Sequence, residues 1–451
     1  DPWCLMQRAG RAAFQRLRAR WPGARALGIV CGPGNNGGDG YVVAALAAEE
    51  GLEVDVVALS DPSTKTAQRA RQAVSAHNIR VREWSESIEL FGEVLVDAVL
   101  GTGLNRAPVG RISECINSFN QDSRPVAALD IPSGLIADSG AVPANVINAD
   151  LTVTFVALKL GLMTGRGPDV RGQLLLDDLG MPSAVFSGSE GIAACLNAGT
   201  VARHLPQRRP TSHKGDAGHL LVVGGDQTMS GAARLSSAAA LRSGAGLVTL
   251  ATHPLHASSA NLNMPELMVN GIPDSSALAD LSAGKKAIVI GPGLGRSVWG
   301  RDLFARFMEQ SLPSVVDADG LNLLAQEPAY SEHWVLTPHP GEAARLLQCV
   351  VRDVENDRPG AVEEIQKRYG GTCVLKGAGT LIASGDLLIH VCGRGNPGMA
   401  SAGMGDLLAG VIGALLVQGL SSAHAAQCGV WLHASAGDIA AGNHPRGLIA
   451  S

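Results

Sequence analysis

The chain has 451 residues, of which 46% are apolar and 17% charged, and this length suffices for two or three globular domains of about 150 residues. Its net charge of −5 argues against a nucleic-acid-binding protein, and the absence of any apolar run of about 18 residues predicts no membrane span. Eight cysteines are scattered without a Cys-x-x-Cys pair, so we expect reduced thiols and a cytoplasmic location.

The first half of the chain alternates short apolar runs with amphipathic stretches, a pattern typical of strands and helices that follow one another in turn. This alternation predicts a mostly parallel sheet covered by helices on both faces. The expected helices span 5–20, 41–50 and 66–77, and the expected strands span 26–31, 54–59, 94–100, 126–129 and 151–157.

Ser, Gly, Pro and Arg collect between residues 186 and 215, which predicts a boundary near residue 190 and two domains, 1–190 and 191–451. The second half repeats the alternation of strands and helices, so we expect a second α/β domain. Its expected strands span 219–223, 247–252, 287–290, 314–316, 334–336, 372–375 and 387–391, and its expected helices span 231–243, 341–347 and 406–417.

A glycine-rich stretch, 32–40, follows the first strand, at the edge where parallel sheets bind ligands. Its Gly-Pro-Gly-Asn-Asn-Gly spacing also matches the dinucleotide-binding Rossmann fingerprint, which is one open alternative. However, two amides and a carboxylate stand where that fingerprint needs small residues. Amide and carboxylate oxygens suit an alkali or alkaline-earth cation, so the stretch could hold both a cation and a phosphate-bearing substrate.

Two further polar clusters follow later strands of the first half. Asp97 lies within one strand and precedes a Gly/Thr/Arg loop at 101–107, and Asp130 and Ser133 follow the next strand. Asp97 alone would as readily be a structural carboxylate. Three clusters at consecutive strand ends instead favour a binding site.

The motifs GPGNNGGDG, VDAVLGTGLNR and LDIPSG, in this order, resemble the NAD(P)H-hydrate epimerase domain over about residues 1–190. The resemblance implies a Rossmann-like parallel-sheet domain that interconverts the R and S epimers at C6 of hydrated NADH and NADPH. This chemistry needs an acid/base carboxylate, for which we nominate Asp130 ahead of Asp39. The implied K⁺ ligands are Asn36, Asp97 and Ser133. The implied hydrate contacts are Asn35, Asn36, Gly37, Gly38, Asp39, Gly101, Thr102, Gly103, Leu104, Asn105, Arg106, Ala107 and Asp130.

Near the end of the chain, the glycine-rich stretch 395–405 runs into an apolar helix with Asp406 in its first turn. Backbone N–H groups without neighbouring Cβ atoms can surround an anion, and the helix N-terminus adds about half a positive charge. Asp406 is then a candidate proton acceptor or donor beside that anion. A carboxylate that merely caps the helix is the alternative.

Other polar or glycine-rich clusters mark the strand ends of the second half. Each is weak alone, since His339 by itself would be an ordinary hydrogen-bonded loop histidine. Occurring in series, they favour a site at the carboxyl edge of the sheet. The clusters span 224–226, 229–233, 290–295, 317–322, 336–342 and 375–380.

The motifs KGDAGHLLVVGGD, MSGAA, GPGLG, DADGLN, LTPHPGE, LKGAGT and GNPGMASAGMGD resemble the ADP/ATP-dependent NAD(P)H-hydrate dehydratase domain, which is ribokinase-like, over about residues 200–451. The resemblance implies that ADP, with Mg²⁺, drives dehydration of the S hydrate to NAD(P)H and yields AMP and phosphate. The choice between ADP and ATP stays open. The implied adenine-nucleotide contacts are Lys376, Gly377, Ala378, Gly379, Thr380 and Gly405. The implied hydrate contacts are Ala232, Gly293, His339 and Asp406, with Asp406 as the catalytic base.

The sequence therefore predicts a bifunctional metabolite-repair enzyme, an isomerase fused to a lyase, that acts on hydrated NADH or NADPH and ADP. We expect a homo-oligomer and no nucleic-acid or membrane partner. One alternative is a ribokinase-like small-molecule kinase fused to a dinucleotide-binding module, which would release a stable phosphorylated product. Another is a non-catalytic first half, which would leave the R epimer untouched.

Overall fold

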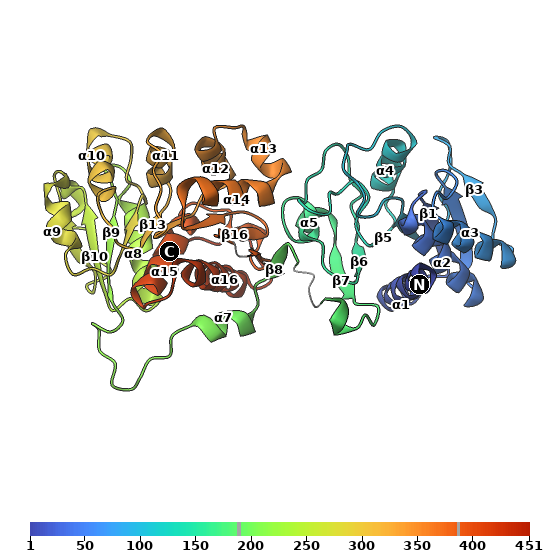
Figure 1. The fold of residues 1–451 in the computed structure, drawn as a ribbon, viewed down its shortest axis with the longest axis horizontal. Coiled ribbons are helices and arrows are strands. Elements are labelled where there is room, and N and C mark those ends of the chain that lie inside the picture. Colours follow the sequence, from blue (N-terminus) through green and yellow to red (C-terminus); the bar gives the residue numbers. More distant parts are fainter. Residues whose placement is uncertain (187–190, 386–387) are drawn as a thin grey trace. The chain divides into compact units, whose positions relative to one another are not determined.

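The computed structural model describes residues 1–186, 191–385 and 388–451. Its chain forms two compact units, Asp1–Glu190 and Gly191–Ser451, both of which are α/β (Figure 1).

The first unit contains a parallel sheet whose described strands lie in the order β3-β2-β1-β4-β5-β6-β7. The direction in which successive strands are added reverses between β1 and β4. Loops that leave these two strands diverge, which opens a crevice at their carboxyl ends. The strands are β1 (Ala26–Cys31), β2 (Glu53–Ala58), β3 (Val81–Glu83), β4 (Val94–Ala98), β5 (Val126–Leu129), β6 (Leu151–Phe155) and β7 (Gln173–Asp177).

Helices cover both faces of this sheet, as the alternation in the sequence predicts. On β1, Leu27 and Ile29 pack in one core cluster with α1, α2 and α3, whereas Val30 packs in a second cluster with α4. A strand buried on both faces explains why its sequence is a continuous apolar run. The helices are α1 (Pro2–Arg20), α2 (Asn35–Glu49), α3 (Lys65–Ala76), α4 (Arg111–Gln121), α5 (Leu160–Met163) and α6 (Gly167–Val170).

The second helix begins six residues earlier than the sequence predicts, at Asn35 rather than residue 41, so Asn35 to Asp39 form helical turns and not a loop. The glycines in these turns allow close packing. A Cβ on Gly37 would lie 2.0 Å from the carbonyl oxygen of Gly32, and a Cβ on Gly40 would lie 2.5 Å from the Cβ of Ala98.

The described strands of the second unit form one sheet in the order β11-β10-β9-β12-β13-β14-β15-β16-β17-β8. Its pairings are parallel except those of β16 with β15 and β17. Leu387, which begins the expected strand 387–391, lies outside the described residues. The strands are β8 (Ala193–Cys195), β9 (His219–Val223), β10 (Leu247–Thr252), β11 (Met268–Gly271), β12 (Ala287–Ile290), β13 (Ser314–Val316), β14 (Trp334–Leu336), β15 (Thr372–Leu375), β16 (Thr380–Ser384) and β17 (Ile389–Cys392).

Helices again flank the sheet, with α10, α11 and α12 on one side and α15 and α16 on the other (Figure 1). Among the described residues, none of the helices combines the length and apolarity that a membrane span requires. The helices are α7 (Ala198–His204), α8 (Ser230–Arg242), α9 (Leu278–Ser282), α10 (Val298–Phe307), α11 (Asp319–Gln326), α12 (Pro340–Leu347), α13 (Val351–Asn356), α14 (Arg358–Tyr369), α15 (Met404–Val417) and α16 (Ser422–Ala441).

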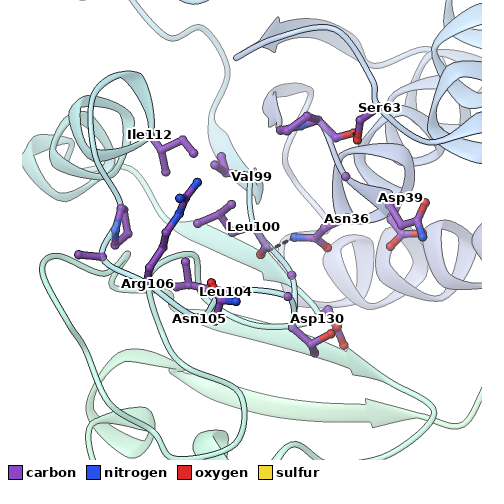
Figure 2. A pocket seen from close by; sticks show the side chains of 18 of the residues that line it. Asn36, Asp39, Ser63, Val99, Leu100, Leu104, Asn105, Arg106, Ile112 and Asp130 are labelled. Carbon is purple, nitrogen blue, oxygen red and sulfur yellow. Dashed lines mark hydrogen bonds between the residues drawn. The ribbon is translucent and has the colours of Figure 1, made fainter. Parts of the chain in front are cut away.

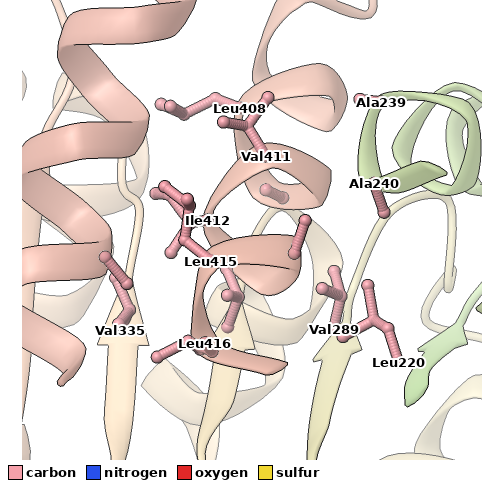
Figure 3. Packing of buried hydrophobic residues seen from close by; sticks show 14 of the residues in the cluster. Leu220, Ala239, Ala240, Val289, Val335, Leu408, Val411, Ile412, Leu415 and Leu416 are labelled. Atoms are coloured by element: carbon pink, nitrogen blue, oxygen red, sulfur yellow. The ribbon is translucent and has the colours of Figure 1, made fainter. Parts of the chain in front are cut away.

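Helix α15, which carries Asp406, is held firmly in the core. Leu408, Ile412 and Leu415 are buried in one cluster with residues of α8, the sheet and α16 (Figure 3). Burying one leucine side chain contributes about 1.5–3 kcal/mol, so this packing fixes the helix strongly. Gly410 brings α15 against α8, since a Cβ there would lie 2.0 Å from the carbonyl oxygen of Ser236. The packing of α15 in the core therefore fixes the position of Asp406.

Candidate active sites

A cavity of about 740 Å³ opens at the carboxyl ends of β1, β4 and β5 in the first unit (Figure 2). Its wall is formed by the first turns of α2, the segment 99–109 and the residue that follows β5. Gly37 and Gly38, although predicted to contact substrate, are buried within α2 and are not among the lining residues. The predicted residues that do line the cavity are Asn35, Asn36, Asp39, Gly101, Thr102, Gly103, Leu104, Asn105, Arg106, Ala107 and Asp130.

Asp130 occupies a strained backbone position at the cavity wall, with φ of +64°. Its carboxylate contacts the ammonium group of Lys159 and accepts hydrogen bonds from Thr154 Oγ1 (3.2 Å) and Phe155 N (3.3 Å). Lys159 also donates to Thr154 Oγ1 and to the Phe155 carbonyl oxygen, each at 2.9 Å. Strain of this kind persists where the surroundings over-determine it, and it clusters at functional sites.

Sequence reasoning missed Lys159. The signal was its place shortly after β6, at the same edge of the sheet as the other polar clusters. It belongs to no glycine-rich motif, so this position was the signal that could have identified it.

Asp39 has a different environment from Asp130. It is only 9% exposed, and no hydrogen bond or ion pair joins its carboxyl group to another residue in the described ranges. Burial raises the pKa of Asp39 well above its usual value, and the negative charge of Asp130 raises it further, against a smaller lowering by Lys159. Asp39 therefore tends to keep its proton.

Two of the predicted K⁺ ligands, Asp97 and Ser133, bond to each other, and the backbone of Leu100 joins Ser133 to the third, Asn36. Asp97 is fully buried, and its carboxylate accepts from Ser133 Oγ (2.6 Å), Ser133 N (2.8 Å) and Val99 N (3.1 Å). Burial raises the pKa of Asp97 to about 6 in spite of these hydrogen bonds. Asn36 Nδ2 donates to the Leu100 carbonyl oxygen (2.8 Å), which leaves Asn36 Oδ1 buried without a partner.

In the second unit, an ion pair lies at the carboxyl ends of β13 and β15. Lys376 Nζ donates to Asp317 Oδ1 at 2.8 Å and lies 3.8 Å from Glu342 Oε2. Asp317 is 1% exposed and also accepts from Thr337 Oγ1 at 2.8 Å. Burial raises the pKa of Glu342 to about 7, although Lys376 opposes the shift. The sequence placed Asp317 and Glu342 in motifs but gave neither a role.

The first turn of α15 lies against this ion pair. A Cβ on Gly405 would lie 3.2 Å from Lys376 Nζ, so glycine permits the close approach of the helix backbone. Burial, followed by the charge of Asp317, raises the pKa of the half-buried Asp406 to about 7, while Lys376 lowers it. Asp406 can thus accept and release a proton near neutral pH.

His339 caps the N-terminus of α12. Its Nδ1 accepts from Gly341 N (3.0 Å) and Glu342 N (3.4 Å), so Nε2 carries the hydrogen of the neutral ring. Burial and the charge of Lys376 lower the pKa of His339, which favours that neutral form. The cap is the structural role that a lone histidine suggested, and Nε2 lies 3.4 Å from Glu342 Oε1.

Ala232 and Gly293 lie together, because a Cβ on Gly293 would approach the Ala232 Cβ to 3.2 Å. The Gly293 carbonyl oxygen accepts from Asp226 N at 2.7 Å. Gly295 N in turn donates to Asp319 Oδ2 at 2.9 Å. Three glycine- and acid-containing motifs that are distant in sequence are thereby tied together at one sheet edge.

The predicted nucleotide loop, residues 376–380, joins β15 to β16. Gly377 and Gly379 have φ of +136° and +63°, which favour glycine. Thr380 Oγ1 donates to the Gly377 carbonyl oxygen at 3.0 Å. Arg358, which is 1% exposed, donates to the Lys376 carbonyl oxygen at 3.1 Å and so supports the loop from below.

Two family models match the chain: one described as YjeF-related protein N-terminus over residues 4–161, and one described as NAD(P)H-hydrate dehydratase over residues 220–451. The bifunctional NAD(P)H-hydrate repair enzyme Nnr of Coxiella burnetii is 45% identical, covering 99% of this chain and 92% of that protein. The protein of that name from Escherichia coli is 46% identical, covering 99% and 87%.

Two solved structures resemble the second unit. The ADP/ATP-dependent NAD(P)H-hydrate dehydratase from Bacillus subtilis, co-crystallised with ATP and Mg²⁺, has a TM-score of 0.51 and 30% identity, covering 55% of this chain and 91% of that one. A ribokinase-like superfamily protein from Enterococcus faecalis has a TM-score of 0.53 and 28% identity, covering 58% and 92%.

The two parallel sheets and their polar carboxyl edges define a two-domain α/β enzyme, and the structural neighbours show that its second domain is ribokinase-like. The sequence identity to the two curated relatives, and the share of each chain that is covered, define the family more specifically. The chain belongs to the family of bifunctional NAD(P)H-hydrate repair enzymes, with an epimerase domain followed by a dehydratase domain. The small-molecule kinase that the sequence left open is therefore not the family of this chain.

The raised pKa of Asp406 generates a prediction for the pH dependence of dehydration. A base must be ionised, so the turnover number should rise as pH increases through about 7 and fall below it. The measurement is the initial rate with saturating S hydrate and nucleotide between pH 5.5 and 9. Glu342→Gln should retain this rise of the turnover number with pH, although Glu342 also has a pKa of about 7. A turnover number that does not change with pH, or loss of its rise in Glu342→Gln, would contradict the assignment of this pH dependence to Asp406.

Proposed function

We propose that the first unit interconverts the R and S epimers of hydrated NADH and NADPH, and that the second uses ADP or ATP to return the S hydrate to NADH or NADPH. The observation that carries this proposal is the gathering of each predicted residue set at the carboxyl edge of its own sheet. Family membership supports both activities. On this proposal, residues 1–190 form the epimerase domain and residues 191–451 the dehydratase domain.

The cavity of the first unit suits an epimerisation of a charged substrate. Figure 2 shows Arg106 at one end of the cavity and the carboxyl groups of Asp39 and Asp130 at the other. The phosphates of the dinucleotide would lie toward the guanidinium group, which places the hydrated ring toward the acids. Inversion at C6 requires a bond to be broken and remade on the opposite face, and Asp130 supplies acid/base catalysis for it.

Dehydration needs a better leaving group than hydroxide. Asp406 removes the proton of the C6 hydroxyl group, and the oxygen of this hydroxyl group attacks the terminal phosphoryl group of the nucleotide. The bond to the rest of the nucleotide then breaks, which gives AMP from ADP. The lone pair of N1 next expels phosphate from C6, and loss of a proton from C5 restores the C5=C6 bond of NADH or NADPH.

The phosphates of the nucleotide would meet three features of the second unit: Lys376 with the loop 376–380, the backbone of Gly405, and the N-terminus of α15. Hard oxygen donors suitable for Mg²⁺ are present nearby on Asp317 and Asp406. Bound with the nucleotide phosphates, as is usual for this ion, Mg²⁺ would offset charge on the transferring phosphoryl group. His339 Nε2 and the Ala232–Gly293 contact would face the hydrate.

The residues of the first unit fit K⁺. Asn36 Oδ1 is a buried carbonyl oxygen without a partner, and the Asp97 carboxylate and Ser133 hydroxyl group supply further hard oxygens. A polar atom buried without a partner is costly, so a bound cation there would stabilise the fold as well. K⁺ would neutralise Asp97 and order the neighbouring loop 101–107.

Two further expectations accompany this function. Among the described residues, which include every cysteine, no disulfide is formed, and this supports a cytoplasmic location. Association of identical chains is also expected, and sedimentation velocity would test it.

Removing the carboxylate of Asp406 should separate the two activities. Asp406→Ala should lower dehydration about 100- to 10,000-fold, the range for general base catalysis, and leave epimerisation unchanged. Chromatography of the R and S hydrates measures epimerisation, and recovery of reduced-dinucleotide absorbance measures dehydration. Asp280→Ala, at an exposed position of α9, is the matched control and should retain both. Loss of both activities in a folded Asp406→Ala protein would rule out two separate sites.

Asp97 generates a prediction about K⁺. Asp97→Ala should abolish or strongly weaken the stimulation of epimerisation by K⁺, because it removes the charged ligand. The measurement is the epimerisation rate against K⁺ concentration at constant ionic strength, maintained with a tetraalkylammonium salt. The thermal unfolding profile of the same variant, followed by circular dichroism, reports whether the first unit is intact. An unchanged K⁺ response in an intact variant would remove Asp97 from the cation site.

A further inference from the structure

Asp130 and Asp39, two acids at the cavity wall of the first unit, differ in whether a positively charged side chain contacts them. Asp130 contacts the ammonium group of Lys159, whereas the carboxyl group of Asp39 has no hydrogen bond or ion pair within the described ranges. Both acids line the cavity, Asp39 from α2 and Asp130 from the end of β5 (Figure 2). Lys159 is itself held by Thr154 Oγ1 and the Phe155 carbonyl oxygen, so its charge stays beside Asp130.

We propose that Asp130 and Asp39 divide the proton transfers of epimerisation, with Asp130, held in place by Lys159, as the base and Asp39 as the acid. This inference rests on the proposed epimerase function of the first unit and gives each acid a separate role. Lys159 is a positioning residue, because it acts through Asp130.

Inversion at C6 needs proton transfer on both faces of the ring. Asp39 gives its proton to the C6 hydroxyl group, the C6–O bond breaks with its electrons on the departing water, and the N1 lone pair forms an N1=C6 bond. Water then attacks C6 from the opposite face, and the electrons of N1=C6 return to N1. Asp130 takes the surplus proton, which passes back to Asp39 before the next turnover. The cationic intermediate forms beside two carboxylates, which stabilise it.

The electrostatics of the cavity agree with this division. Burial and the charge of Asp130 raise the pKa of Asp39, so that Asp39 is protonated at a pH where an exposed carboxyl group is ionised. Of the charged groups that act on Asp39, Asp130 raises its pKa and Lys159 lowers it. Removing the charge of Lys159 should therefore raise the pKa of Asp39 further.

The test is the pH profile of epimerisation of purified R-hydrated NADH by the full chain, with the enzyme-free rate subtracted at each pH. Lys159→Met should move the high-pH limb, where Asp39 loses its proton, to higher pH, because the charge of Lys159 lowers the pKa of Asp39. Lys159→Arg should restore the wild-type profile. A Lys159→Met profile that is lower but has an unmoved high-pH limb would overturn the proposal, because a structural role predicts only that.

Two amide variants test the acids themselves. Asp39→Asn and Asp130→Asn should each lower the turnover number about 100- to 10,000-fold with a small change in KM. Wild-type turnover in Asp39→Asn would overturn its role as the acid. A wild-type thermal unfolding profile of each variant, followed by circular dichroism, confirms that the first unit is folded. If the wild-type chain fails to convert R to S, the epimerase function itself fails, whereas wild-type conversion with an unmoved high-pH limb in Lys159→Met overturns the division of roles alone.

Discussion

A buried carboxylate is costly unless a cation or several donors reach it, and this cost organises both sites of the enzyme. Asp317 meets Lys376, Asp130 meets Lys159, and Asp97 meets three donors. Within the part of the chain that the structure describes, Asp39 and Asp406 have no such direct partner, and burial raises the pKa of each. Donors and cations hold Asp97 and Asp317 in the architecture. In the proposed function, Asp130 is a base that Lys159 holds in place, and Asp39 and Asp406 also transfer protons.

The two units reach this arrangement with the same local device. In each, a glycine-rich stretch at a strand end or loop leads into a helix whose early turns carry the acid, Asp39 on α2 and Asp406 on α15. Glycine lets the backbone approach a neighbour that any side chain would strike, as Gly37 and Gly405 show. The helix N-terminus adds partial positive charge, which suits a phosphate-bearing substrate.

The sequence was most informative where a feature depends on residues that are close to one another in the chain. Continuous apolar runs such as Ala26–Cys31 predicted buried parallel strands, and polar residues at strand ends predicted where the cavity lies. The predicted start of α2 was wrong, because its glycines suggest a loop. In the structure these glycines lie in helical turns that pack closely on Gly32 and Ala98. Lys159 was missed because its partner, Asp130, is 29 residues away and no spacing rule joins them. The pairings of Asp317 and Glu342 with Lys376 are likewise tertiary.

The most direct test of the central claim uses the intact chain on a mixture of R- and S-hydrated NADH with ADP, Mg²⁺ and K⁺. The account predicts that reduced-dinucleotide absorbance recovers to the full amount of both epimers, and only when nucleotide is present. Recovery that stops when the S epimer is exhausted would contradict it, because the first unit would then not be a working epimerase. Recovery without nucleotide would contradict the phosphoryl-transfer chemistry at Asp406.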